Sequence, residues 1–402
     1  MTLNHLLFNQ SSIKTQSISS IPGQYDYIIT GAGCAGLSLV MYMVNDDKLK
    51  DKKILLLDKD PKTSNDRTWC FWEKQKGLFQ SIVYKEWQNL SLYTHELTKD
   101  LKIDPYIYKL IRGIDFYNHG LKNIKQFPNV HFMQADVEDI ASSEKETFVL
   151  VNGRKIYGQY IFNSIIFKKP NLRSNQYWLL QHFKGWFIET VEPVFDAGSA
   201  TLMDFRTGQE KGTAFFYILP FSAKTALIEY TLFSTKLLAE NEYEEALKNY
   251  TELQLKIKNY TILKKEFGMI PMTNYSFASA KNNIINIGTA GGQTKASSGY
   301  TFSFIQKHSM DIVKGLSESG DPTTYFKKTK RFGFYDSILL HILYHQKLKG
   351  EEIFERLFDK NKAALVFKFL DNETSLAEEI TIIRSLPALP FMKAAMKQIG
   401  TF

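Results

Sequence analysis

The chain has 402 residues and a net charge of +8 at pH 7, with an isoelectric point near 9.0. This length is too great for one simple core, so we expect two closely packed domains. The only two cysteines, Cys34 and Cys70, exclude a disulfide framework and a cysteine-based zinc site, and a reducing cytoplasm is the simplest compartment.

The first clear pattern runs from Tyr25 to Thr30, where β-branched and aromatic residues predict a buried strand. It follows a polar N-terminal extension, residues 1–20, that lacks the apolar run of a signal peptide. Gly31, Gly33 and Gly36 come next as Gly-x-Gly-x-x-Gly and open a predicted helix. Such glycines allow a tight turn, the approach of a pyrophosphate to the backbone, and close packing of helix on strand.

A second predicted strand, residues 53–58, ends in Asp58, which lies 22 residues after Gly36. This spacing is near that of the carboxylate that binds ribose in dinucleotide-binding units. The complete pattern favours a dinucleotide site over an unrelated glycine turn. Residues 27–44 carry no charge; we interpret them as a buried strand-turn-helix rather than a membrane span, and we expect no transmembrane helix.

An aromatic stretch follows a polar loop. Residues 66–73 read Asp-Arg-Thr-Trp-Cys-Phe-Trp-Glu. Two interpretations stay open: the aromatic residues wall a flavin or an apolar ligand, with Arg67 reaching the pyrophosphate, or they pack domain against domain. The aromatic content of 14% is equally open, because an extended apolar cavity and a coding bias towards Lys, Ile and Phe both explain it.

The part of the chain between residues 87 and 165 predicts further strands and one helical connection. Strand-like alternation covers residues 87–101, and residues 106–120 show helical spacing. Strands are predicted over residues 129–135, 147–151 and 160–165, with a hairpin at Asn152-Gly153.

From Tyr177 to Tyr230 the pattern changes to consecutive antiparallel strands, which predict a second, β-sheet domain. These strands are expected over residues 178–183, 185–190, 200–205, 214–219 and 226–231. A helix over residues 240–258 follows. The chain then returns to the first domain through a strand and glycine turn (283–292) and a helix from about residue 300, and it ends in helices after Pro322.

These elements predict an α/β fold of the large flavoprotein class, in which the first glycine motif binds the ADP half of FAD and the second turn lies near the isoalloxazine. The first domain is then a Rossmann-type, glutathione-reductase-like FAD-binding domain, with an inserted antiparallel β-sheet substrate domain and a helical C-terminal region. The expected division is an N-terminal extension (1–20), the FAD-binding domain (21–75, 115–170 and 265–320), the substrate domain (76–114 and 171–264) and the C-terminal helical region (321–402).

A series of motifs extends this interpretation between residues 25 and 311. In chain order they are the strand-turn-helix at 25–39, Asp-Arg-Thr-Trp-Cys-Phe-Trp (66–72), Phe-Asn-Ser (162–164), Met-Asp-Phe-Arg (203–206), Leu-Pro-Phe-Ser (219–222), Leu-Ile-Glu-Tyr-Thr (227–231), Gly-Met-Ile-Pro-Met (268–272), Ile-Gly-Thr-Ala-Gly-Gly (287–292) and Ser-Gly-Tyr-Thr (298–301). This ordered combination resembles the lycopene cyclase family, and it is more specific than any single motif.

The resemblance implies a lycopene beta-cyclase, an intramolecular lyase of the isomerase class. Such an enzyme closes the linear ψ-ends of lycopene to β-ionone rings, through gamma-carotene to beta-carotene, by acid catalysis without net redox change. It requires reduced FAD, with NADPH or NADH as the expected electron source. Because the substrate is a hydrocarbon without hydrogen-bonding groups, it needs an apolar tunnel, a poised acid, and negative charge where the cation develops.

By the same resemblance, Glu229 matches the family's essential strand glutamate, which we assign as proton donor or acceptor. Burial near aromatic side chains would raise its pKa and keep it protonated at neutral pH. Many relatives have a second acidic residue directly after this glutamate, where this chain has Tyr230. Asp204 is the candidate partner, unless it forms an internal salt link to Arg206, and Glu189 is a further candidate.

Cofactor contacts are expected at the same motifs. The pyrophosphate is assigned to Gly31, Gly33, Gly36 and Arg67, the ribose to Asp58, and the surroundings of the flavin ring to Gly291, Gly292 and Gly299. Related hydroxylases often carry Asp at the ribityl position, where this chain has Thr289. The histidines show no ligand spacing, so we predict no metal.

The expected partners are lycopene and a membrane surface. A C40 hydrocarbon dissolves in the bilayer, so the resemblance implies a cytoplasmic enzyme associated peripherally with the inner membrane. Residues 380–402 mix apolar side chains with Arg384, Lys393 and Lys397, and they lie either in the membrane interface or on the enzyme's own surface. The scattered lysines come without a nucleic-acid-binding motif, which makes nucleic acid the less favoured partner.

Three alternatives remain. A flavin monooxygenase or halogenase of the same fold would consume NAD(P)H and oxygen, but its Asp-Gly signature is absent at Asn163-Ser164. An isoprenoid reductase would consume reducing equivalents in proportion to product. A non-catalytic flavin- or carotenoid-binding protein would be indifferent to the loss of Glu229.

Overall fold

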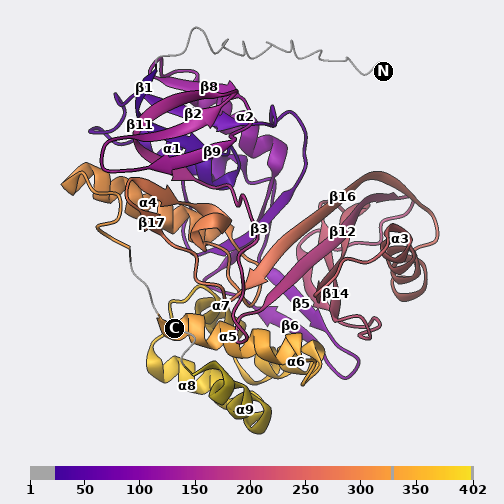
Figure 1. The fold of residues 1–402 in the computed structure, drawn as a ribbon. Coiled ribbons are helices and arrows are strands. Elements are labelled where there is room, and N and C mark those ends of the chain that lie inside the picture. Colours follow the sequence, from indigo (N-terminus) through magenta and orange to yellow (C-terminus); the bar gives the residue numbers. More distant parts are fainter. Residues whose placement is uncertain (1–22, 327–329, 400–402) are drawn as a thin grey trace, which may run out of the picture.

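The computed structural model describes residues 23–326 and 330–399, and the predicted extension over residues 1–20 lies outside them. The described strands form three sheets. Figure 1 shows the first sheet at one end of the molecule, the second sheet to one side, and the C-terminal helices below both.

The first sheet is built on the strand-turn-helix that the glycine motif predicts. β1 (Gln24–Thr30) lies between the parallel strands β2 (Ile54–Asp58) and β11 (Arg154–Asn163). β8 (Val130–Gln134) and β18 (Ile284–Asn286) extend the parallel part, while β9 (Asp139–Ser142), β10 (Thr147–Val151) and β17 (Ala280–Lys281) pair antiparallel. The helices that share its core are α1 (Cys34–Val44), α2 (Gly113–Ile124) and α4 (Phe302–Ser319). The predicted strands, the hairpin and the interpretation of residues 27–44 are confirmed.

Two glycines of this turn, Gly31 and Gly36, have no room for a side chain. Gly31 has a φ of +97°, and a Cβ on Gly36 would lie 1.9 Å from the Gly31 carbonyl oxygen. The turn therefore holds β1 and α1 in close contact, as the motif requires.

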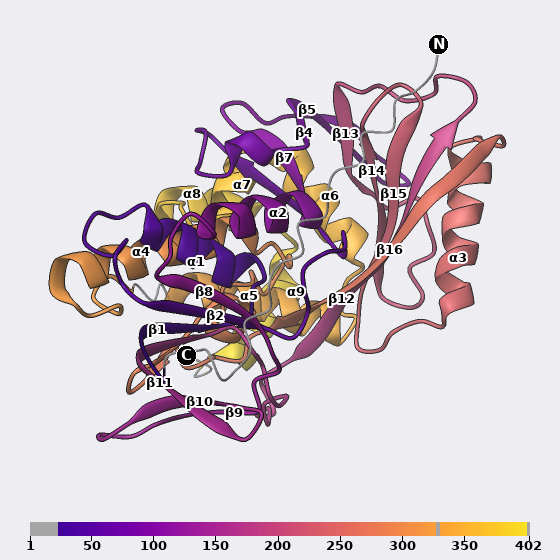
Figure 2. The same cartoon turned by 90° about the horizontal axis from the view of Figure 1, so that it is seen from above.

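The second sheet has the order β16-β12-β15-β14-β13-β5-β6. Its strands are β5 (Asn89–Tyr93), β6 (Thr98–Lys102), β12 (Trp178–Thr190), β13 (Ser199–Asp204), β14 (Thr213–Pro220), β15 (Thr225–Ser234) and β16 (Tyr260–Thr273). One face packs against α3 (Glu240–Asn249), and Figure 2 shows this helix on the outer side of the sheet. The other face belongs to the largest apolar core of the described chain.

The structure differs from the predictions for this domain at four points. Residues 178–190 form one strand rather than two, because β12 pairs along its length with β15 and β16, and Lys184 at the expected break is buried against glutamates of α3. β13 pairs antiparallel with β14 but parallel with β5. β16 was not predicted as a strand, and the helix expected over residues 240–258 ends at Asn249 and continues as the π-helical turn η3 (Tyr250–Gln254).

The third sheet corrects the helix-rich connection expected over residues 106–120. Residues 107–112 form β7 (Ile107–Arg112), which lies between β3 (Thr68–Glu73) and β4 (Lys85–Trp87), and the helix begins only at Gly113. Because β7 is largely buried on both faces, its apolar residues do not alternate, and such a run is as compatible with a helix as with a strand. Two 3-10 turns, η2 (Gln80–Ile82) and η4 (Gly288–Gly291), complete the irregular elements.

The described chain ends in helices, which confirms the predicted helical C-terminal region. These helices complete the core under the second and third sheets. They are α5 (Lys330–Tyr344), α6 (Gly350–Lys360), α7 (Ala363–Leu370), α8 (Leu376–Arg384) and α9 (Ala388–Gln398). Phe367 of α7 stacks on Trp72 with ring centroids 4.5 Å apart. No helix in residues 23–326 and 330–399 is long and apolar enough to cross a membrane.

A buried ion pair joins these helices to the loop before α4. Lys295 Nζ lies 2.8 Å from Asp336 Oδ1, with side chains 1% and 11% exposed, and it also donates to Asn372 Oδ1. We expect Asp336→Leu to lower the free energy of unfolding by about 3–5 kcal/mol, because Lys295 would keep a buried charge without its partner. The double variant Lys295→Met/Asp336→Leu should regain most of that loss in denaturant unfolding.

The exposed pair Lys50–Asp47 is the control, since its removal should leave the free energy of unfolding nearly unchanged. Equal losses in the single and double buried variants would contradict this prediction.

Candidate active site

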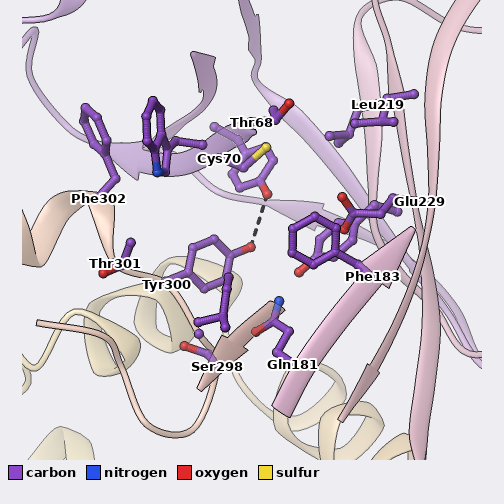
Figure 3. Close-up of a pocket in the computed structure, with 16 residues that line it drawn as sticks. Thr68, Cys70, Gln181, Phe183, Leu219, Glu229, Ser298, Tyr300, Thr301 and Phe302 are labelled. Carbon is purple, nitrogen blue, oxygen red and sulfur yellow. Dashed lines mark hydrogen bonds between the residues drawn. The ribbon is translucent and has the colours of Figure 1, made fainter. Parts of the chain in front are cut away.

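A cavity lies where the third sheet, the second sheet and the segment before α4 meet. Figure 3 shows its walls. The third sheet contributes Thr68, Trp69, Cys70 and Tyr108, and the second sheet contributes Gln181, Phe183, Tyr217, Leu219, Leu227, Glu229 and Ile270. The segment before α4 contributes Ser298 to Thr301, and α4 itself contributes its first residue, Phe302. In the stretch at residues 69–72, Trp69 and Cys70 line the cavity, whereas Trp72 packs in the core. The stretch therefore contributes both to the cavity wall and to the packing between the sheets and the C-terminal helices.

Glu229 of β15 is the acidic side chain among these lining residues. Its Oε1 accepts a hydrogen bond of 2.9 Å from Thr231 Oγ1. Burial raises the pKa of Glu229 well above its usual value, and the negative charge of Glu266 adds to this effect. The side chain keeps some accessible surface, which faces the cavity. Burial therefore favours the protonated form of the Glu229 carboxyl.

Glu266 of β16 is a residue that the sequence reasoning missed. β12 lies between β15 and β16, and its Gly185 is opposite both Glu229 and Glu266. A Cβ on Gly185 would lie 2.7 Å from Leu227 Cδ1 and 3.0 Å from Glu266 Cγ, so glycine leaves the gap in which the two side chains meet. Glu266 Oε2 also accepts a hydrogen bond of 3.0 Å from Thr68 Oγ1.

Aromatic side chains cover the wall opposite Glu229. The hydroxyls of Tyr108 and Tyr300 are 3.1 Å apart, and this bond is drawn in Figure 3. Burial raises the pKa values of Tyr108, Tyr217 and Tyr300, so their hydroxyls stay neutral. Electron-rich ring faces in a dry site attract a cation. Only the order of the strands brings these tyrosines together, and the sequence holds no local signal for it.

Asp204 does not line this cavity. Its carboxylate forms a two-point ion pair with Arg206 and accepts a hydrogen bond of 2.5 Å from Tyr250 OH. The ring of Tyr250 stacks on Phe216, which belongs to the core under α3 on the other face of the sheet. The internal salt link to Arg206, the alternative that the sequence left open, is therefore what forms. Glu189 is exposed near the end of β12.

The residues assigned to the nucleotide gather around the start of α1. Asp58 Oδ2 accepts a hydrogen bond of 2.7 Å from the Ala32 backbone N–H, which brings this carboxylate to the glycine turn. α1 begins without a capping side chain or an acidic residue in its first turn. A Cβ on Gly33 would meet no described atom within 4 Å, so the backbone at this glycine borders open space.

The second glycine turn lies against the first. A Cβ on Gly288 would lie 2.9 Å from the Cβ of Ala35, so η4, which contains Gly291, adjoins the start of α1. Gly292 has a φ of +77°, and a Cβ there would lie 3.9 Å from Phe277 Cδ2. Arg67 pairs with Asp66 at 2.8 Å, and the electrostatic effect of its charge reaches Cys34 at the start of α1.

Gly299 connects this region with the cavity. It has a φ of +74° and lines the cavity together with Gln181. The buried atoms Gln181 Oε1 and Ser298 Oγ have no hydrogen-bond partner among the described residues. The structure thus brings Glu229 and Gly299 to one cavity and the other glycines to a neighbouring site. No group of three or more His, Cys, Asp or Glu in the described ranges could hold a metal ion.

Comparisons with known proteins give information on the fold and on the family. A search of curated proteins gives no significant match. Among solved structures, the chain is similar to a flavoprotein/dehydrogenase from Cytophaga hutchinsonii, with a TM-score of 0.63 and 11% identity over 94% of this chain and 99% of that one.

Two further structures have comparable similarity. A geranylgeranyl bacteriochlorophyll reductase-like protein from Thermoplasma acidophilum gives a TM-score of 0.56 and 12% identity over 94% and 97% of the two chains. A probable FAD-dependent monooxygenase from Pseudomonas aeruginosa gives 0.56 and 12% over 81% and 98%. At such identities these matches concern the fold, and they confirm the predicted flavoprotein fold.

The family is decided by the sequence. The family model described as "Lycopene cyclase protein" matches residues 26–396, nearly the whole chain. Its span contains both glycine turns, the cavity residues and most of the C-terminal helices. The resemblance inferred from the ordered motifs is confirmed, and the chain belongs to the lycopene cyclase family.

Proposed function

We propose that this protein is a lycopene beta-cyclase, which closes the linear ends of lycopene into β-ionone rings without net oxidation or reduction. One observation carries the proposal: Glu229, a carboxyl with a strongly raised pKa, borders a cavity that is otherwise largely aromatic and apolar. Such a group is a protonated acid at neutral pH, in surroundings that suit a hydrocarbon.

The reaction balances without a co-reactant. The Glu229 O–H bond breaks and a C–H bond forms at the terminal double bond, which leaves a tertiary carbocation. The neighbouring double bond supplies the electron pair for the ring-closing C–C bond, and the positive charge moves to its other carbon. Loss of a ring proton then forms the double bond of the β-ionone ring. The Glu229 carboxylate is the base nearest to the cavity that can take this proton.

The tyrosine rings provide the second part of catalysis. Tyr108, Tyr217 and Tyr300 line the cavity with Glu229. Their faces offer negative electrostatic potential to a carbocation but no lone pair as basic as a carboxylate, so they stabilise the cation without trapping it.

We propose FAD in its reduced form as the cofactor, with NADPH or NADH as the electron source. The residues fit it: Gly31, Gly33 and Gly36 with the uncapped start of α1 would hold the pyrophosphate, and Asp58 the ribose. Arg67 and the glycines Gly291, Gly292 and Gly299 are proposed as further contacts, and the unpartnered Gln181 Oε1 and Ser298 Oγ suit a polar ring edge. When bound, the reduced cofactor supplies fixed negative charge beside the cavity.

A peripheral contact with the membrane is proposed for the last two helices. Large apolar side chains on α8 and α9 are exposed by 42–73%: Leu376, Ile380, Ile383, Leu389, Met392, Met396 and Ile399. We call this set the C-terminal apolar surface. The exposed cations Arg384, Lys393 and Lys397 lie in the same segment. Apolar side chains beside cations are typical of helices that lie on an anionic bilayer.

The assignment of Glu229 is tested in a bacterium that accumulates lycopene. The unchanged protein should turn red cells orange and give cyclic products of the same mass as lycopene. Glu229→Gln should lower the rate by about 10²–10⁴-fold, because the amide cannot donate the proton. The control is Glu245→Gln, an exposed glutamate on α3, which should stay active. Products that differ from lycopene by hydrogen or oxygen would contradict the proposal.

Flavin retention tests the glycine turn separately. Because a Cβ on Gly33 meets no described atom within 4 Å, Gly33→Ala should fold as the unchanged protein does. The same methyl group would fill the space through which a pyrophosphate approaches the backbone, so we expect loss of the yellow absorbance after gel filtration. The control Gly23→Ala, where a Cβ also has open space, should remain yellow. A colourless unchanged protein that cannot retain added FAD would overturn the cofactor.

Vesicle sedimentation tests the C-terminal apolar surface. Met392→Glu/Met396→Glu should greatly reduce binding to vesicles of anionic phospholipid, because it places two negative charges where apolar contact is expected. The control is Leu253→Glu on η3, where the leucine is 73% exposed but remote from α8 and α9 in sequence. Binding should also weaken with added salt. Unchanged binding of the double variant would show that another surface is responsible.

A further inference from the structure

Two carboxyl groups meet at the cavity wall, although their strands do not pair with each other. β15 carries Glu229 and β16 carries Glu266, and both strands pair with β12 at Gly185. Because Gly185 has no side chain, the two glutamates come into hydrogen-bonding contact across it. Glu229 lines the cavity, and Glu266, only 6% exposed, lies behind it.

Such a contact requires a proton between the groups. Two ionised carboxylates can only accept hydrogen bonds, and their like charges repel each other in a buried site. Glu266 Oε2 accepts from Thr68, whereas its buried Oε1 finds no N–H or neutral O–H donor among the described residues. Burial and mutual repulsion therefore disfavour two carboxylates here and favour a proton on the pair.

The surroundings decide which carboxyl carries that proton. Burial raises the pKa of Glu266 as it does that of Glu229, but at Glu266 the positive charge of Lys264, on the same strand, opposes this effect, and the raise at Glu229 is the larger one. The other titratable groups that face Glu229 are Cys70 on β3, Tyr217 on β14 and Tyr300 before α4, and burial keeps all three neutral. Each carboxyl has one threonine donor, Thr68 on Glu266 and Thr231 on Glu229, so these two bonds offset each other. The negative charge belongs on Glu266 and the proton on Glu229.

We infer that Glu266 is a positioning residue for the acid: its carboxylate, which accepts a hydrogen bond from Thr68 and feels the positive charge of Lys264, keeps the proton on the carboxyl across Gly185 that faces the cavity. This inference rests on the proposed function, in which Glu229 protonates the substrate. When Glu229 has given up its proton, two carboxylates lie beside the carbocation. Their charge stabilises the cation, and it draws the proton lost on ring closure back to Glu229, so that each turnover restores one proton on the pair.

The test is the pH dependence of turnover in Glu266→Gln. Activity needs protonated Glu229, so it is present below the pKa of Glu229 and lost as the pH rises through it. Removing the negative charge of Glu266 lowers that pKa, and the basic limb of the profile should move to lower pH by about one pH unit. At a pH above the basic limbs of both proteins, turnover by Glu266→Gln should be about tenfold lower than turnover by the unchanged protein. Glu266→Asp keeps the charge and should restore the original limb.

A second measurement needs neither substrate nor cofactor. In the infrared spectrum, the unchanged protein should show the C=O stretch of a protonated carboxyl at neutral pH, and Glu229→Gln should lose it. Glu266→Gln should change its frequency and lower the pH at which it disappears. The conservative variant Thr68→Val provides the same test if Glu266→Gln does not fold, because loss of this donor moves the proton towards Glu266. Glu245→Gln is the matched control.

The outcomes separate the two proposals. An unshifted pH limb and an unchanged infrared band in Glu266→Gln would overturn the positioning role, even if the enzyme cyclises lycopene. Full cyclisation by Glu229→Gln would overturn the assignment of the acid, whereas the infrared band would still report whether the carboxyls share a proton.

Discussion

A carboxyl group retains its proton at neutral pH only where water and unpaired cations are kept away, and the second sheet is arranged to meet this requirement. Glu229 lies on an inner strand of that sheet, with the third sheet and the segment before α4 closing over it. The neighbouring tyrosines and Cys70 add bulk without charge. An isolated ammonium or guanidinium group at this wall would draw the proton away, and the nearby Lys264 acts on Glu266 instead.

Strand geometry explains why the second carboxyl comes from another strand. Successive side chains in a strand point to opposite faces, so residue 230 cannot share the cavity with Glu229. Tyr230 accordingly packs in the core under α3. A carboxyl that contacts Glu229 must come from an adjacent position across the sheet, and Gly185 makes this possible between strands that are not direct neighbours. In this chain the two acids therefore come from two strands, and Tyr230 is no obstacle to their pairing.

Local patterns were sufficient for the glycine turn, for β1, α1 and β2, and for most strands of the second sheet, because periodicity and turn residues act over a few positions. The errors arose where pairing between strands that are distant in the sequence determines the secondary structure. Residues 107–112 became a strand because two partners flank them, and β12 continues through Gly185 because β15 and β16 hold it on both sides. Glu266 reads as one charge in Lys-Lys-Glu, and only the strand order brings it to Glu229. Asp204 lies away from the cavity lining, paired with Arg206 and Tyr250, and the sequence does not reveal on which face of the sheet it lies.

The position of β16 at the end of the sheet order has a consequence for how this enzyme would fail. An outermost strand is bonded along one side only, and such strands open by local fluctuation at a lower free-energy cost than inner ones. Opening of β16 would admit water to Glu266, and the dry surroundings that hold the shared hydrogen ion would be lost while the first sheet stays folded. Mild denaturant or gentle heating would then silence the acid well before the molecule melts. Local opening of the edge strand β16, rather than unfolding of the first sheet, would then limit the conditions under which the protein is active.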